Sequence, residues 1–130
     1  MIKNLVPQEA WDVLQHNAHA VLVDVRTKME HGYVGHPPGA IHIPWKEAPD
    51  WQVNGQFVVE VKKIAPKVDS PILLLCRSGQ RSLDAAKALE NAGYQYLINI
   101  VDGFEGPLDE HKHRGLLGGW RFSGLPWEQS

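Results

Sequence analysis

Residues 72–93, ILLL-CRSGQRS-LDAAKALENAG, predict a buried strand, a short polar loop and a helix in direct succession. The run Ile72–Leu75 is apolar at every position, which is typical of a strand covered on both faces. From 81 to 92 the apolar residues recur at helical spacing, and Gly93 supplies a left-handed stop. One strand–loop–helix unit is therefore expected here.

The rest of the chain repeats this alternation. Further strands are predicted at 21–25 and 97–101, with a shorter one at 41–43. Helices are predicted at 7–16, which opens on Pro7, and at 57–65, while 45–56 is expected to be irregular. Alternation with connections of this length indicates parallel strands joined by crossovers. We expect an α/β fold, a three-layer sandwich with a mostly parallel central sheet and helices on both faces.

The length, composition and net charge of the chain limit the kinds of protein that it can be. A chain of 130 residues with 43% hydrophobic residues can bury an ordinary core, so we expect a single domain over 1–130. A net charge of -2 argues against nucleic acid or an anionic membrane as partner. The start of the chain lacks the apolar region of a secretory signal, and no apolar run approaches the ~20 residues that span a bilayer. We expect a cytoplasmic monomer.

The loop at 76–82 carries the candidate chemistry. Its lone cysteine, Cys76, follows a buried strand and precedes a helix whose positive end favours a thiolate. Arg77 and Arg81 are the only charged residues from 70 to 83, so we expect a positive local field. The other loop residues are small or adaptable and can turn successive N–H groups inward as an anion nest: Ser78, Gly79, Gln80 and Ser82. The competing interpretation is that Cys76 merely fills the core.

CRSGQRS resembles the active-site loop of rhodanese-type sulfurtransferases. Residues 22–26, LVDVR, followed by Glu30 and by GHPPGAIHIP at 35–44, are similar to the first signature of that family, with Pro37 in place of an aliphatic residue. VDGFEG at 101–106, then Gly119-Trp120 and GLPW at 124–127, resembles its closing pattern, lengthened by an insertion at 107–117.

This resemblance implies a rhodanese-like fold and a double displacement through a Cys76 persulfide. Cys76 would be catalytic, and the substrate would be bound by the rest of the loop: Arg77, Ser78, Gly79, Gln80, Arg81 and Ser82. The donor would be thiosulfate or a similar small anion. The acceptor would be cyanide, a thiol or a protein cysteine. No metal or other cofactor is implied.

Two alternatives stay open: a rhodanese-like module that binds a partner or senses oxidants without turnover, and a cysteine phosphatase. Cysteine phosphatases place Arg six residues after Cys, where this chain has Ser82, so the loop is too short to surround a phosphate. We rank phosphatase activity below sulfur transfer.

Several other polar residues are interpreted as structural. Asp24 and Arg26, at the end of a predicted strand, are expected to tie loops together. His111 and His113 lack the further ligands that a zinc site needs. Trp120 is expected in the core.

Overall fold

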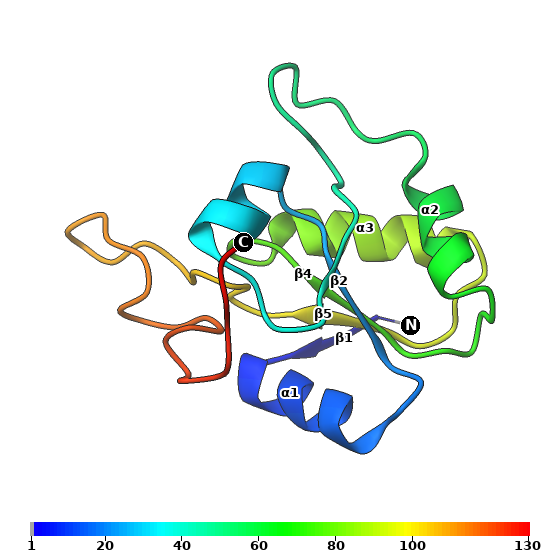
Figure 1. Cartoon of the computed structure of the whole chain (residues 1–130), viewed down its shortest axis with the longest axis horizontal. Helices are drawn as coiled ribbons and strands as arrows, with labels where there is room; N and C mark the ends of the chain where they lie inside the picture. Colours follow the sequence, from blue (N-terminus) through cyan, green and yellow to red (C-terminus); the bar gives the residue numbers. More distant parts are fainter. Residues whose placement is uncertain (1) are drawn as a thin grey trace.

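The computed structural model describes residues 2–130 and is built on a five-stranded, wholly parallel sheet (Figure 1). The order across the sheet is β1-β5-β4-β2-β3. The strands are β1 (Ile2–Leu5), β2 (Val21–Asp24), β3 (Ile41–His42), β4 (Ile72–Leu75) and β5 (Leu97–Ile100). The predicted fold class is confirmed.

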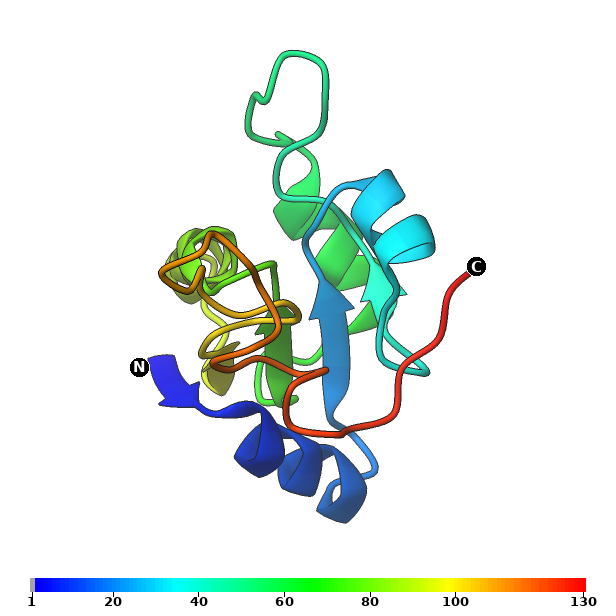
Figure 2. The same cartoon turned by 90° about the vertical axis from the view of Figure 1, so that its left-hand side faces the viewer.

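Helices cover both faces of this sheet (Figures 1 and 2). Helix α1 (Pro7–His16) lies on one face, and α2 (Phe57–Ile64) and α3 (Gln80–Asn91) lie on the other. All three were predicted to within one residue at each end. Pro7 occupies the first turn of α1, where its missing N–H costs nothing, and Gly93 follows α3 with a φ of 100°.

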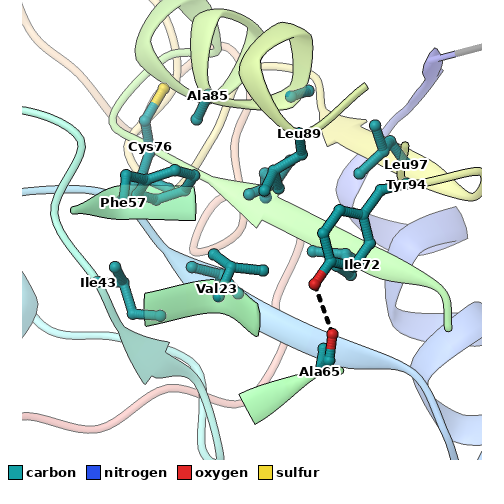
Figure 3. Packing of buried hydrophobic residues seen from close by; sticks show 14 residues of the cluster. Val23, Ile43, Phe57, Ala65, Ile72, Cys76, Ala85, Leu89, Tyr94 and Leu97 are labelled. Carbon is teal, nitrogen blue, oxygen red and sulfur yellow. Dashed lines mark hydrogen bonds between the residues drawn. The ribbon is translucent and has the colours of Figure 1, made fainter. Parts of the chain in front are cut away.

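Each side of the sheet holds its own apolar core, because side chains alternate along the strands. Leu73, Leu75, Ile98 and Ile100 pack toward α1 together with Trp120. Ile72, Leu74 and Leu97 pack toward α2 and α3, and Cys76 continues their row. Figure 3 shows this second core, with Cys76 at its edge and the sulfur directed toward α3. Burial of both faces explains the uninterrupted apolar runs that predicted these strands.

Two elements were not predicted. Strand β1 reads IKNL, with two exposed polar residues, and it forms the edge of the sheet beside β5. Residues Glu30–Val34 form a π-helical turn that is closed by Gly35, whose amide donates to the Glu30 carbonyl. Neither segment has the periodicity of a regular buried element.

The C-terminal segment returns across the molecule after β5. Trp120 is fully buried, as predicted, and its ring meets Trp11 of α1 edge-on with centroids 5.8 Å apart. Its indole N–H donates to the Pro126 carbonyl over 2.7 Å. Glu128 then exchanges two backbone hydrogen bonds with His36. Within residues 2–130, no helix has both the length and the apolar character needed to cross a membrane.

The sheet order positions a crevice at the carboxyl ends of β2 and β4. The chain leaves β2 toward β3 on one side, and it leaves β4 through α3 toward β5 on the other. Loops that depart in opposite directions from neighbouring parallel strands leave a gap between them, and ligands bind in such gaps. The loop after β4 begins with Cys76.

Candidate active site

Cys76 follows β4 directly and is 1% exposed. The backbone N–H of Gly79 donates to its sulfur over 3.0 Å, and the Ser82 hydroxyl lies 3.2 Å from it. Gly79 has a φ of 117°, which glycine adopts without strain, and this turns its N–H back toward the sulfur at the start of α3. Two hydrogen-bonding groups thus converge on one sulfur atom.

The segment after β5 forms the floor of this loop. The Phe104 amide donates to the Cys76 carbonyl over 2.8 Å, and the Glu105 amide donates to the Arg77 carbonyl over 3.0 Å. Gly103 makes the approach possible, since a Cβ at this position would lie 2.7 Å from the Arg77 carbonyl oxygen. The closing motif of the sequence therefore holds the cysteine loop in place.

Arg81 faces the loop that leaves β2. Its guanidinium donates to both carboxylate oxygens of Glu30, over 2.8 and 2.9 Å. Burial opposes ionisation of Glu30, but the hydrogen bonds and charge of Arg81, with hydrogen bonds from Thr27, outweigh it and lower the pKa of Glu30 below its ordinary value. A carboxylate from a distant part of the chain therefore opposes one of the two positive charges that the sequence places in this loop.

Arg77 is exposed and lines a pocket of about 630 Å³ between the two loops. Met29, Val34, Ala48 and Trp51 form its apolar walls. Three carboxylates and three guanidiniums also line it: Glu30, Glu47, Glu105, Arg77, Arg81 and Arg114. The pocket therefore combines apolar walls with equal numbers of positive and negative side chains.

The predicted loop residues have different surroundings. Cys76, Gly79 and Ser82 are brought together, while Arg77 and Arg81 reach the pocket. Ser78 is exposed, and the exposed Gln80 donates its side-chain amide to Asp84 on α3.

Behind the cysteine, Ser82 continues into two polar residues that were not predicted from the sequence, Asn99 and Asn4. The Ser82 oxygen is 2.5 Å from Oδ1 of the buried Asn99 on β5. Asn99 in turn donates through Nδ2 to Oδ1 of Asn4 on β1, over 3.0 Å. One signal was available in the sequence, because Asn99 is the lone polar residue in the apolar run LINIV.

Asp24 and Arg26 tie the loop after β2 together, as expected. Both are fully buried, and Arg26 donates to both Asp24 oxygens and to the Gly35 carbonyl. Burial opposes ionisation of Asp24 and so acts to raise its pKa. Hydrogen bonds from His31 and Arg26, with the charge of Arg26, outweigh this effect and lower the pKa of Asp24 to about 2. Across residues 2–130, no group of three His, Cys, Asp or Glu side chains is placed to hold a metal ion.

Comparison with known proteins assigns this arrangement to a family. The model of the rhodanese-like domain matches residues 6–109. The thiosulfate sulfurtransferase GlpE of Haemophilus influenzae is 33% identical over 104 residues, covering 80% of this chain and 86% of that protein. An uncharacterized protein of Rickettsia conorii, RC0915, is 37% identical and covers 98% of both chains. The crystal structure of Rv0390 from M. tuberculosis superposes with a TM-score of 0.87 at 39% identity, over 98% of both chains.

Proposed function

Because this chain belongs to the rhodanese-like domain family, we propose that it is a sulfurtransferase that carries a sulfane sulfur on Cys76. The observation that carries the proposal is the convergence of the Gly79 N–H and the Ser82 hydroxyl on the cysteine sulfur. The Gly79 N–H donates to the sulfur, and the Ser82 hydroxyl can turn to donate to a thiolate, which is the nucleophilic form of cysteine. The positive end of α3 favours the same charge.

The first step with thiosulfate is a displacement at the outer sulfur. The Cys76 thiolate forms a new S–S bond to that sulfur, and the bond between the two thiosulfate sulfurs breaks. Its electron pair leaves with sulfite, and Cys76 becomes a persulfide anion. Sulfite is a good leaving group, so the step needs a thiolate and stabilised negative charge more than a general acid.

The second step returns the cysteine to its starting state. An acceptor such as cyanide or a thiolate attacks the outer persulfide sulfur, and the electron pair of the broken S–S bond returns to Cys76. With cyanide the product is thiocyanate, and with a thiolate it is a new persulfide. The pocket beside the loop is large enough to admit a small thiol or the cysteine of an acceptor protein.

Thiosulfate is the donor we propose, since the Haemophilus relative is named as a thiosulfate sulfurtransferase. Arg77 is the exposed cation nearest in sequence to Cys76, and it would attract such an anion to the pocket. Phosphate-ester hydrolysis fits less well, because Arg81 is already occupied by both oxygens of Glu30 and lies one position too early for a phosphatase loop.

Intact-mass measurement after incubation with thiosulfate tests the proposal. The wild-type protein should gain the mass of one sulfur atom and lose it again on addition of cyanide, with release of thiocyanate. Cys76→Ser should gain nothing. Ser78→Ala removes an exposed hydroxyl but keeps the backbone N–H of the same loop, so it should still load. A wild-type protein that gains no sulfur, or a Cys76→Ser variant that does, would refute sulfur transfer at Cys76. The former result would favour a binding or redox-sensing module.

A further inference from the structure

We propose that Asn99 is a positioning residue whose amide, set by Asn4, decides whether the Ser82 hydroxyl donates to the Cys76 sulfur. The inference rests on the proposed sulfur transfer, because it concerns the charged state of the cysteine in that reaction. It starts from the chain of contacts from Cys76 through Ser82 and Asn99 to Asn4, which links the sulfur to the edge of the sheet.

Asn99 lies where an apolar residue is expected. Along β5, Leu97 packs toward α3, so Asn99, two residues later, faces the same side. It is 4% exposed, and Asn4 is its register partner on β1. A buried amide is costly unless its hydrogen bonds are satisfied. Ser82 and Asn4 satisfy them here.

The present arrangement suits a neutral cysteine. Ser82 has one proton, and its oxygen is 2.5 Å from Asn99 Oδ1, which can only accept. The hydroxyl therefore donates to Asn99, with the Gly79 carbonyl as a second acceptor 3.1 Å away. Its lone pairs then face the sulfur, and the Cys76 S–H can donate to them.

A thiolate or persulfide anion requires the opposite arrangement. The Ser82 proton must turn to the sulfur. The Ser82 oxygen and Asn99 Oδ1 then face each other with no proton between them to form a hydrogen bond. Rotation of the Asn99 amide by half a turn removes this conflict, because Nδ2 then donates to the Ser82 oxygen. Asn99 Oδ1 now faces Asn4, so the Asn4 amide must rotate as well and donate. The two arrangements have the same shape, since an amide is nearly symmetric in outline.

Asn4 is exposed, so a substitution at this position can be used to control the rotation of the Asn99 amide. An aspartate there can only accept a hydrogen bond when ionised, so it would hold Asn99 Nδ2 toward β1. Asn99 Oδ1 would then stay against Ser82, and the Ser82 hydroxyl would go on donating its proton to Asn99 instead of to the sulfur. Asn4→Asp should therefore disfavour the thiolate, although residue 4 does not touch the cysteine.

The test is a pH titration of the thiolate by its ultraviolet absorbance, with Cys76→Ser subtracted as blank. Asn4→Asp should move the titration to higher pH by about one unit, the effect of one lost hydrogen bond to a charged group. Asn4→Ala removes the partner without adding an obligate acceptor, so it should titrate like the wild type. No shift in Asn4→Asp, or an equal shift in Asn4→Ala, would overturn the inference.

Two controls separate the amide chain from the added charge. In an Asn99→Leu background, Asn4→Asp should no longer move the titration, because the chain is broken. The shift in the otherwise wild-type protein should also persist in high salt, which screens a charge acting through solvent. A shift that survives Asn99→Leu, or that salt abolishes, would show a plain electrostatic effect and refute the role of Asn99.

Apart from the charge that Asn4→Asp adds at residue 4, the charged groups around the cysteine stay the same in these variants. Arg81 interacts electrostatically with Cys76, and Glu30 and Asp24 interact with Arg81. None of the three is changed. The titration also needs no sulfur donor, so it decides the role of Asn99 even if the protein fails to load sulfur from thiosulfate, which would refute only the proposed function.

Discussion

The Arg81 guanidinium and the Glu30 carboxylate form a bidentate ion pair that joins the first turn of α3 to the π-helical turn after β2. The two residues are 51 positions apart in the sequence, and both side chains are less than one-fifth exposed. The pair therefore neutralises the cation that stands nearest the start of α3, beside a pocket that must admit an anionic donor under the proposed function.

Replacing Glu30 by Gln should raise kcat/KM for thiosulfate by roughly two- to fivefold, because it leaves the charge of Arg81 unopposed at a partly hydrated site. Steady-state kinetics at low and high salt measure this, and salt should reduce the gain. Glu47→Gln removes the same charge from the same pocket without touching Arg81. An equal gain in Glu47→Gln would mean that the overall charge of the pocket matters and the ion pair does not.

Arg77→Ala should lower kcat/KM for thiosulfate by roughly two- to fivefold, the size expected for one exposed charge. Adding salt should reproduce part of this loss in the wild type and change the variant little. Lys87→Ala removes an equal charge from an exposed position of α3 and serves as the control. If the Arg77→Ala and wild-type kinetics coincide at every salt concentration, Arg77 does not handle the donor.

Gly103→Ala should displace the cysteine loop. The new Cβ would lie 2.6 Å from the Arg77 carbonyl carbon and 2.7 Å from its oxygen, and these backbone atoms cannot move without moving Cys76. We expect a lower melting temperature and a persulfide yield well below that of the wild type. Gly124 has a similar positive φ but open space around it, so Gly124→Ala carries the conformational cost of about 1–2 kcal/mol alone. Equal persulfide yields in the two variants would contradict this account.

Stability should fall in acid because of Asp24. Its pKa is about 2 in the folded protein against an ordinary value of 3.8, so the folded state binds this proton less readily than the unfolded state. The resulting stabilisation, about 2 kcal/mol, is complete above the ordinary value and is lost as the pH falls through about 2. Glu30, whose pKa is also lowered, acts in the same direction.

Urea unfolding between pH 5 and pH 2 measures this dependence. Asp69→Asn changes an exposed aspartate and should keep the wild-type slope of unfolding free energy against pH. Asp24→Asn should be less stable at neutral pH, since it leaves Arg26 buried without its counter-charge, and its slope should be shallower. A slope that is identical in all three proteins would show that Asp24 makes no such contribution.

The sequence predicts those parts of this molecule that are encoded locally. β4, the loop and α3 lie in one continuous stretch, so periodicity and two glycines suffice to define them. β1 escaped because an edge strand with polar residues has no pattern of its own. The contact between Glu30 and Arg81 could not be predicted, because it depends on how the turn after β2 meets the start of α3. The sequence indicated Glu30 only as part of the first family signature. Asn99 stands out in the sequence as a polar residue within an apolar strand. Its hydrogen-bond partners, Ser82 and Asn4, could not be predicted from the sequence.

The strand order also restricts the order in time in which the strands can pair during synthesis. Within the described residues 2–130, the strands that pair with their immediate successors are β2 with β3 and β4 with β5, and β1 pairs with β5 at the edge of the sheet. Synthesis proceeds from the N-terminus, so β1 is made first yet must wait until residues 97–100 have emerged. Closing such long loops is slow. During synthesis, Asn4 therefore reaches Asn99 only after β5 has emerged, so the polar chain behind Cys76 cannot be complete before residues 97–100 are made.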